Sequence, residues 1–357
     1  MQYFYFISLF FSVVLVHNSV KDNKFNSYIY YWFVLVVALV LGLRGNEDEY
    51  TRVYVLIPTL DVFFSSGHDV INEKGLVFSL ISSFFKTFGL NSQSIFLFFS
   101  GVGVFLHAKY FQKFTRYYFL SFLLYLSHEI CFKEWVGLRM GLASAMLLPM
   151  IHCLYNDQKV KFLCLVVAAT LIQYVAVLSI ILLFLNRKIK PRLLWLGLLF
   201  AVAILQLNIV STLVHYLSDL GFLPDIVVSY LSAESYVYDV GLTHPKTIQQ
   251  IITVSVMIIL FGYKKEVISV YYNLLFNAYY LSTIFLILFA ELALFAFRFG
   301  GHFYSVEPIL VTYIVVTCKQ RTLVANLLSI LALIIAYVNY VIVGRVSEYD
   351  FLVNYPV

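Results

Sequence analysis

Long apolar runs alternate with short polar segments along almost the whole chain. Most of these runs approach the ~20 residues that an α-helix needs to cross a bilayer. The runs lie at about 2–17, 28–43, 76–90, 94–108, 117–132, 140–155, 160–186, 192–208, 247–263, 267–290, 303–317 and 322–343. The pattern predicts an all-α fold, in which a polytopic bundle of helices spans a membrane.

The composition favours lipid as the surroundings of this chain. Of its 357 residues, 62% are hydrophobic and 12% are charged, and the mean hydropathy is +0.88. Soluble domains carry about 25% charged residues, so this chain has too few ionic groups to cover a globular surface. A cytosolic enzyme, a secreted domain and a disordered protein are thereby excluded. The first run has no basic residues before it and no cleavage site, so we expect it to stay in the membrane.

The charged residues predict an orientation. Six short loops hold 15 of the 24 Lys and Arg residues but only three acidic residues. These loops lie at 21–24, 109–116, 157–161, 187–192, 264–266 and 319–321. The positive-inside rule places these loops in the cytoplasm. Because most basic residues lie in them and orient the chain, the net charge of +5 indicates no nucleic-acid partner. The longer segments 44–75 and 209–246 then form outer loops, where we expect the chemistry.

This orientation requires that the run 76–90 does not cross the membrane. Its polar residues are spaced i, i+3, i+4 and i+7, which gives a polar stripe on one face of a helix. They are Ser79, Ser82, Ser83 and Lys86. We predict a periplasmic amphipathic helix that lies at the interface or against the bundle.

The run 160–186 has basic loops at both of its ends, so it must enter the membrane and return. We predict a bent or re-entrant hairpin that turns near Gln173 and Tyr174. Irregular backbone at membrane depth is tolerated inside a protein bundle or a wet cavity. The fold class is then a single integral membrane domain over 1–357 with about 12 membrane segments, including this hairpin.

Three arginines lie at outer ends of runs, against the side preference of basic residues. They are Arg44, Arg139 and Arg298. Arginine stays charged and binds phosphate through two parallel hydrogen bonds, so together they are suited to a lipid diphosphate. Carboxylates at Glu47 and Asp48 follow the first arginine closely and offer a general base. The alternative is that each arginine is an interfacial anchor whose charge reaches the headgroups.

The segment around Arg298 is predicted to be a flexible turn at the outer edge of the bundle. The arginine is followed by Gly300 and Gly301, and then by His302 and Tyr304. Several other signals are missing from the sequence. It has no Asp-x-Asp pair, no Gly-x-x-x-x-Gly-Lys-Ser/Thr loop and no His, Glu or Cys cluster with metal spacing. We therefore expect no metal and no cofactor.

Several short motifs resemble those of a known family. They are Arg44…Asp48…Tyr50 with Tyr54, Glu73-Lys74-Gly75, Gly-Leu-Arg139-x-Gly-Leu-Ala143, the stretch from Lys161 to Gln173-Tyr174, and Arg298…Tyr304. In this order they resemble the EpsG-type, or Wzy-like, polysaccharide polymerases over residues 40 to about 310. The chain departs from that family where Gln173 replaces a usual histidine. Glutamine forms hydrogen bonds but takes no proton near neutral pH.

The resemblance implies a metal-independent membrane glycosyltransferase of the bacterial inner membrane. Such enzymes join oligosaccharide repeat units of O-antigen or a related surface polysaccharide, which are carried on a polyprenyl diphosphate. Asp48 or Glu47 would be the base, with Glu73 as second choice. Arg44, Arg139 and Arg298 would hold the diphosphate. The other residues expected to bind substrate are Tyr50, Tyr54, Gln173, His302 and Tyr304, of which the tyrosines would stack against the sugars or hydrogen-bond to them. A regulator of chain length is the implied protein partner.

Two other functions stay open at this point. A flippase for lipid-linked oligosaccharide would carry charges in the middle of several spans and show pseudo-symmetric halves. The mid-span regions here hold almost no charge, which disfavours it. An O-antigen ligase has the same types of functional residue, although a longer outer loop than 209–246 would be expected for it.

Overall fold

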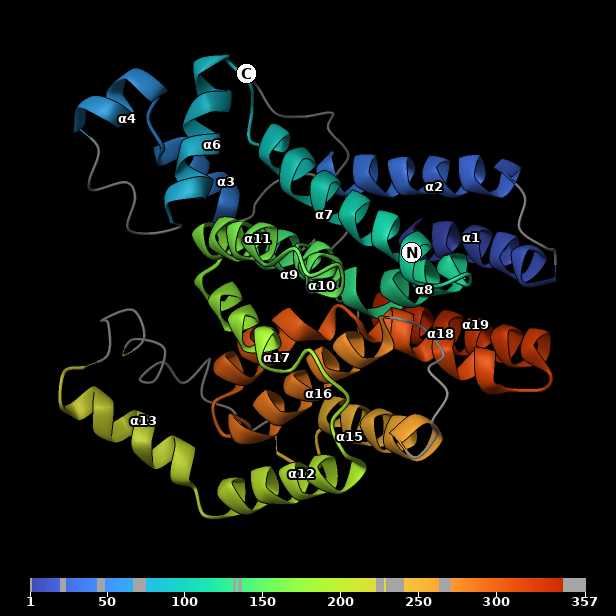
Figure 1. Cartoon of the computed structure of the whole chain (residues 1–357). Helices are drawn as coiled ribbons and strands as arrows, with labels where there is room; N and C mark the ends of the chain where they lie inside the picture. The colour runs from blue at the N-terminus through green and yellow to red at the C-terminus, as the bar shows by residue number, and fades with distance from the viewer. Residues whose placement is uncertain are drawn as a thin grey trace. The chain divides into compact units, whose positions relative to one another are not determined.

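The structure is a computed structural model that describes residues 2–19, 24–43, 49–66, 75–130, 133, 137–222, 228, 241–262 and 271–342. All regular elements in these ranges are helical (Figure 1). The first half contains α1 Gln2–Ser19, α2 Lys24–Gly42, α3 Glu49–Leu56, α4 Leu60–Ser66, α6 Leu76–Thr87, α7 Gln93–Phe114, α8 Tyr118–Leu124, the π-helical η1 Tyr125–Glu129, α9 Leu138–Ala145, α10 Leu147–Tyr155 and α11 Lys159–Ile172. The second half contains the 3₁₀-helix η3 Tyr174–Leu183, α12 Pro191–Gln206, α13 Ile209–Asp219, α15 Pro245–Met257, η4 Ile258–Gly262, α16 Tyr272–Leu288, α17 Ala293–Tyr304, α18 Glu307–Thr317, α19 Arg321–Tyr337 and η5 Val338–Ile342. The predicted all-α class is confirmed.

Three helices in the described part are long and apolar enough to cross a membrane. They are Gln93–Phe114, Leu138–Tyr155 and Arg321–Ile342. The number rises to five if two bent pairs each form one span, namely α12 with α13, bent by 55°, and α17 with α18, bent by 52°. The shorter apolar helices, which include the stretches Phe4–Ser19 of α1 and Asn26–Gly42 of α2, have 10–17 residues, which is short for a ~30 Å hydrocarbon core. The count of about twelve segments stays a prediction.

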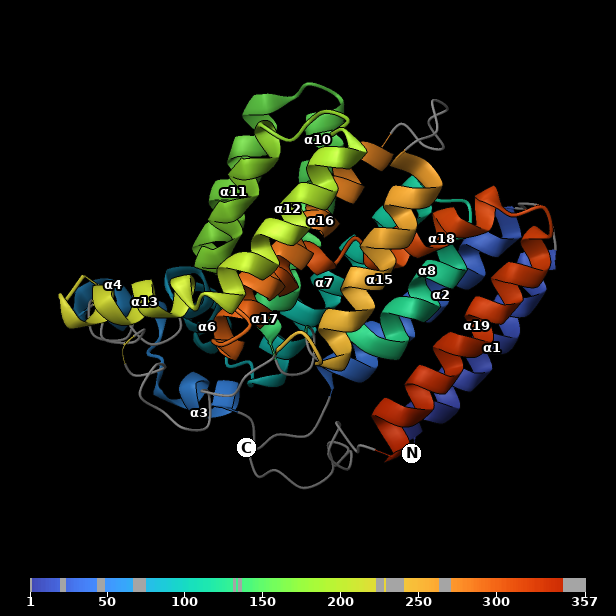
Figure 2. The ribbon, with the colours of Figure 1, turned by 90° about the horizontal axis from the view of Figure 1, so that it is seen from below.

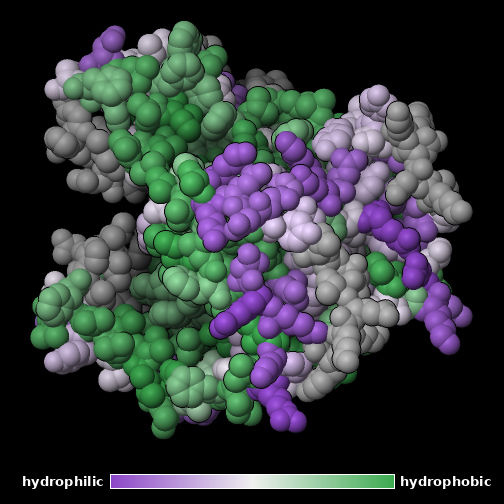
Figure 3. Space-filling view, viewed as in Figure 1, coloured by the Kyte–Doolittle hydropathy of each residue, from purple (hydrophilic) through white to green (hydrophobic). Residues whose placement is uncertain are grey.

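Large areas of the protein surface are apolar, as Figure 3 shows for one face. On α12 and α19 large apolar side chains follow one another along the exposed faces. They are Leu193, Leu196, Leu199 and Phe200 on the first helix, and Leu323, Leu327, Ile330, Leu331 and Ile334 on the second. Soluble monomers rarely expose apolar patches of this extent. The protein is therefore a helical membrane protein.

The chain divides into two compact units, and each is described by itself. Unit 1 comprises Met1–Met150, Val160–Val177 and Val311–Val357. In it α7 packs on α2 and α9, and α1 lies along α19 (Figure 2). Polar side chains join these helices: Asn18 Nδ2 donates to Asn326 Oδ1 at 3.1 Å, and Tyr30 donates to the Ala108 carbonyl at 3.0 Å. Such hydrogen bonds between helices are typical of membrane bundles.

Unit 2 comprises Ile151–Lys159 and Leu178–Leu310. Its central helix is α16, which packs against α12, α15 and α17. Asn277 of α16 donates to the carbonyls of Leu185 and Arg187 at 2.6 and 2.9 Å, and Tyr280 donates to the Leu194 carbonyl at 2.8 Å. These bonds hold the polar segment before α12 against the central helix.

The helix predicted at 76–90 is α6, and its polar stripe faces the protein. Ser79, Ser82 and Ser83 are fully buried, while Leu80 and Phe84 are exposed. Lys86 Nζ ends the stripe by donating to the carbonyls of Val55 and Ile57, at 2.8 and 2.7 Å. The exposed apolar face suits contact with lipid; the periplasmic position of the helix stays a prediction.

Gln173 marks a break in the backbone, as predicted for the turn of the hairpin. The α-helical hydrogen bonds of α11 end there, and a 3₁₀-helix of ten residues follows from Tyr174. Runs of 3₁₀-helix longer than 3–4 residues are uncommon, so this segment is an unusual one. Whether the chain returns to the same side of the membrane stays a prediction.

The prediction of a flexible turn around Arg298 is wrong. Arg298 lies within α17, and Gly300 and Gly301 are helical. A Cβ built on Gly300 would lie 3.1 Å from the Ser282 carbonyl oxygen, so glycine is needed here for close packing of α17 on α16. The predicted outer loops are also partly helical, because 44–75 contains α3 and α4 and 209–246 contains α13.

Candidate functional site

The predicted site residues fall into three groups. Arg44, Glu47, Asp48 and Glu73 lie outside the described residues. Tyr50, Tyr54, Arg139 and Gln173 belong to unit 1, and Arg298, His302 and Tyr304 belong to unit 2. The geometry of the candidate site is therefore built from two clusters.

In unit 1 the separate motifs meet on one hydrophobic cluster. Tyr50 and Tyr54 of α3, Phe78 of α6, and Leu138 and Leu142 of α9 are all buried in it. Ile172, the last residue of α11, packs against the same cluster and immediately precedes the break at Gln173. The helices α3, α6, α7, α9 and the end of α11 are thus held together by apolar contact, with α7 contributing Ile95, Phe96 and Phe99 (Figure 1).

Arg139 lies where two helices of this cluster begin. It is the second residue of α9, and a Cβ built on Gly75, the residue before α6, would lie 3.4 Å from its Nη1 atom. Gly75 has φ +83° and ψ 157°, a conformation that is essentially restricted to glycine. The chain therefore keeps a residue without a side chain beside the guanidinium group.

The charge of Arg139 is unfavourable for its own helix. A helix N-terminus carries about half a positive charge, and a cation in the first turn is repelled by it. In the described part of the chain, neither Gly75 nor Gly137 provides a side-chain cap for the helix that follows. The guanidinium group of Arg139, a residue in the first turn of α9, thus lies beside the residue that precedes α6, and a cation at a helix N-terminus is an arrangement that suits an anion.

Tyr54 of this cluster also makes polar contacts. Its hydroxyl donates to the Leu90 carbonyl, and Lys86 Nζ lies 5.8 Å from the centre of its ring. Desolvation by burial raises the pKa of Tyr54 above its ordinary value of 10.0. Tyr54 is therefore neutral at physiological pH, and it acts in this structure as a hydrogen-bond donor.

Unit 1 also contains a buried ion pair that sequence reasoning missed. Lys133 Nζ and Glu129 Oε2 are 2.6 Å apart, and both side chains are almost fully buried. Glu129 ends the π-helical segment η1, a geometry that often occurs at functional sites. The i, i+4 spacing of an acid and a lysine at the end of an apolar run was the signal that could have revealed the pair.

In unit 2 the described polar groups gather on Glu307, the first residue of α18. Its Oε1 atom accepts from Gln249 Nε2 at 2.6 Å, and its Oε2 atom accepts from the Tyr279 hydroxyl at 3.1 Å. Lys246 Nζ lies 3.8 Å from Oε2 and 3.0 Å from the centre of the Tyr304 ring. We call these five residues the Glu307 network. Its members lie on four helices, and no spacing in the sequence joins Glu307 to Lys246, Gln249 or Tyr279.

The predicted site residues of α17 belong to the interior of unit 2. His302 is fully buried, and its Nε2 atom lies 2.7 Å from Ser179 Oγ of η3. Tyr304 is buried in the Glu307 network, whereas Arg298 is half-buried on the same helix. Contact of His302 and Tyr304 with sugar stays a prediction, and their described contacts are with the protein.

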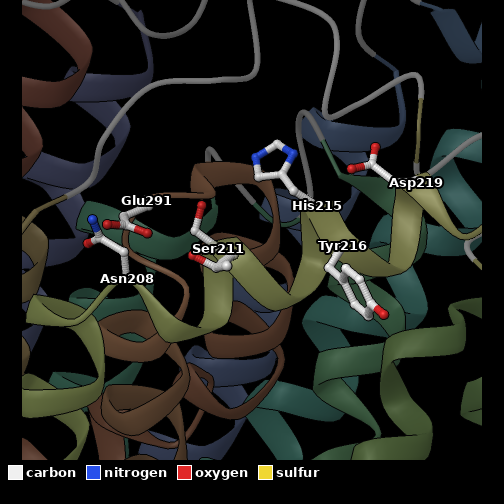
Figure 4. A pocket seen from close by; sticks show the side chains of 7 residues that line it. Asn208, Ser211, His215, Tyr216, Asp219 and Glu291 are labelled. Carbon is white, nitrogen blue, oxygen red and sulfur yellow. The ribbon is translucent and has the colours of Figure 1, made fainter.

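A polar pocket of about 530 Å³ opens beside α13 in unit 2. Ser211, His215 and Asp219 point to the same side of that helix, and Asn208 and Glu291 lie together at its start (Figure 4). Among the described residues, no group of three His, Cys, Asp or Glu side chains is placed to hold a metal ion. The pocket therefore offers hydrogen-bonding groups to a ligand.

The described helices define a helical membrane protein with several candidate spans, in which Arg139 of unit 1 lies beside the starts of two helices. The EpsG family model matches residues 27–356, and the chain belongs to that family. The chain is also similar to the amylovoran biosynthesis protein AmsC of Erwinia amylovora, at 24% identity over 368 residues, which cover 95% of this chain and 92% of that protein. No solved structure matches it.

Proposed function

We propose that this protein is a polysaccharide polymerase of the bacterial inner membrane. It joins oligosaccharide repeat units carried on a polyprenyl diphosphate, at the outer face of the membrane. Membership of the EpsG family and the similarity to a protein of amylovoran biosynthesis support this function. The observation that carries it is the position of Arg139 beside two helix N-termini.

The reaction replaces one bond at the anomeric carbon by another. A sugar hydroxyl of one repeat unit attacks the anomeric carbon of the growing chain, and the polyprenyl diphosphate leaves with the electrons of the broken bond. Negative charge on the diphosphate grows as the bond breaks. Arg139 and the first-turn N–H groups of α6 and α9 stabilise that charge, and this lowers the barrier if the contacts tighten in the transition state.

The proton of the attacking hydroxyl passes to a carboxylate. Asp48 is the proposed base, with Glu47 next to it and Glu73 as second choice. In the sequence Asp48 immediately precedes α3, and Glu73 is two residues before Gly75. An opposite charge favours the ionised form of a carboxylate, so a base that works together with the arginines accepts the proton late, when the hydroxyl has become acidic.

The remaining proposed contacts are with the diphosphate and the sugars. Arg44 and Arg298 are proposed as further diphosphate ligands. Gln173 is proposed to hydrogen-bond to sugar, since its amide is at a backbone break beside the cluster that holds α9. Tyr50 and Tyr54 are proposed to support the site by packing, because both side chains are buried in that cluster.

Substitution of Arg139 tests this function. Arg139→Ala removes a charge-assisted contact of about 1.5–3 kcal/mol, so we expect the rate of polymerisation to fall roughly 10- to 100-fold. Arg139→Lys keeps the charge but loses the fork of two parallel donors, and should retain part of the activity. Membrane vesicles given lipid-linked repeat units and analysed by glycan chain length on gels provide the measurement.

Arg192→Ala is the matched control, because Arg192 is an exposed arginine at the start of α12. It should give the wild-type ladder of chain lengths. If Arg139→Ala also gave that ladder at equal protein level, Arg139 would be an interfacial anchor and the diphosphate site would be wrong. If wild-type vesicles moved repeat units across the membrane without joining them, the protein would be a flippase.

A further inference from the structure

Helix α13 separates its polar and apolar residues completely. At 100° per residue, the polar side chains occupy one arc of the helix and the apolar ones the other. The polar arc holds Ser211, Thr212, His215, Ser218 and Asp219, and the apolar arc holds Ile209, Val210, Leu213, Val214, Tyr216 and Leu217. No residue of α13 is buried. The separation of its polar and apolar residues is therefore suited to the surroundings of the protein and not to packing in a core.

A sharp bend places this helix at an angle to its neighbour. Asn208 has φ +53°, a left-handed conformation that asparagine tolerates, and the axes of α12 and α13 differ by 55°. An amphipathic helix that follows an apolar one at such an angle is suited to lie in the membrane interface. Its apolar arc, with Leu213 exposed by 53%, then contacts lipid, and its polar arc faces away from lipid.

The polar arc forms one wall of the pocket of about 530 Å³ (Figure 4). Glu291, which lies between α16 and α17, completes the lining beside the start of α13, where its Oε1 atom can accept from the Asn208 side-chain amide. The ring of Tyr216 lies at the edge of the pocket and is exposed by 59%. This volume is in the range of ligand pockets, which measure about 300–1,000 Å³.

The chemistry of the pocket selects a class of ligand. Its described lining contains two carboxylates, three hydroxyls, an imidazole and an amide, and no lysine or arginine. Asp219 and Glu291 repel a diphosphate. They accept hydrogen bonds from hydroxyl or ammonium groups.

We propose that this pocket is a binding subsite for the glycan part of the lipid-linked substrate, taking uncharged or amino-bearing sugars. The inference rests on the proposed function, since the lipid anchor would hold the glycan at the membrane surface, where α13 lies. Sugar hydroxyls donate to Asp219 and Glu291 and accept from Ser211 and Thr212. The subsite binds substrate and takes no part in the chemical step.

Binding of free oligosaccharide tests the subsite directly. The probe is the repeat-unit oligosaccharide that mild acid releases from the lipid carrier of the producing strain, and titration calorimetry on the full chain in nanodiscs measures its affinity. Asp219→Asn and Glu291→Gln each remove a charged acceptor, so we expect about tenfold weaker binding or more. Ser218→Ala, on the same polar arc but outside the pocket lining, should bind as wild type does.

Polymerisation measured on the same proteins separates the two proposals. If the subsite is correct, both carboxylate variants raise KM for the repeat unit about tenfold and leave kcat within twofold. Wild-type affinity in both variants, or no binding by the wild type, would overturn the subsite even if polymer forms. If the wild type binds the oligosaccharide and the carboxylate variants bind it more weakly, but the wild type makes no polymer, then the proposed subsite is supported and the proposed polymerase function is overturned. Because Asp219 lies on a helix without buried residues and Glu291 is only partly buried, these variants should keep the wild-type fold.

Discussion

Glu307→Gln removes the negative charge on which the Glu307 network depends. In the wild type the carboxylate is nearly inaccessible to solvent and accepts from Gln249 and Tyr279, with Lys246 Nζ at 3.8 Å. Hydrogen bonds to a charged group contribute about 1.5–3 kcal/mol each and neutral ones about 0.5–1.5 kcal/mol. Neutralising the acceptor of two such bonds, and leaving the Lys246 charge without this carboxylate, should cost about 2–4 kcal/mol in the free energy of unfolding.

Lys246→Met distinguishes the ion pair from the hydrogen bonds. Glu307 keeps both neutral donors in this variant, so we expect a smaller loss of about 1–2 kcal/mol. In the double variant the replacement of Lys246 costs less free energy of unfolding than in the single variant, because the side chain at position 307 is already neutral. The combined loss should therefore fall short of the sum by roughly 1 kcal/mol, within the range for residues in direct contact.

Unfolding in mixed micelles with an increasing fraction of denaturing detergent, followed by circular dichroism, measures these losses. Asp157→Asn is the matched control, because Asp157 pairs with Lys159 at 3.5 Å but both side chains are more than two-thirds exposed. An exposed pair contributes at most about 1 kcal/mol. If Glu307→Gln unfolded at the same detergent fraction as the control, or if the losses were additive, the reasoning about the network would be refuted.

Three further predictions follow from the packing and the orientation. Gly300→Ala should destabilise the protein by about 1–3 kcal/mol, because its Cβ would press on the Ser282 carbonyl, whereas Gly101→Ala meets only Ala38 Cβ at 3.9 Å and should be mild in the same unfolding assay. Gly75→Ala imposes strain of about 1–3 kcal/mol at φ +83° beside Arg139, so polymer length on gels should decrease more than for Gly89→Ala, which is also at a positive φ of +69° but whose added Cβ meets nothing within 4 Å. In a background without the four native cysteines, an impermeant thiol reagent should label Thr212→Cys in intact cells and should not label Lys188→Cys; the reverse result would invert the orientation.

The helices could be predicted from the sequence wherever a long apolar run carries the signal. Every predicted run corresponds to a helix or to a pair of consecutive helices, including α6 with its stripe of serines. Helix α17 was missed because Gly300 and Gly301 are typical of turns, and only the contact with Ser282 explains why glycine is helical there. Helix α13 was missed although its polar residues have helical spacing, since their number suggested a loop.

The candidate site could be predicted only in part, for a different reason. Arg139 was identifiable because a cation at the outer end of an apolar run is unusual, and the motifs around Tyr50 and Gly75 do meet it through the hydrophobic cluster. Lys246 and Glu307 are 61 positions apart in the sequence, and each alone resembles a solvated charge. Their pairing depends on how α15 and α18 pack in unit 2, which no local pattern contains.

The two candidate binding regions differ in the charge of their side chains, and the two parts of the proposed substrate differ in charge in a matching way. A lipid-linked repeat unit has an anionic diphosphate and a glycan rich in hydroxyls. Two unit charges 4 Å apart interact by about 4 kcal/mol at an effective dielectric constant of 20, so a carboxylate in direct contact with the diphosphate would weaken its binding strongly, whereas the proposed base contacts the attacking hydroxyl. In unit 1 the described groups beside Gly75 are Arg139 and helix N-termini, whereas the α13 pocket of unit 2 carries Asp219 and Glu291. Substitution of Asp219 by lysine should therefore let inorganic pyrophosphate compete with the released oligosaccharide at this pocket, which the wild-type pocket should not allow. Competition by pyrophosphate in the wild type would show that charge does not select the ligand there.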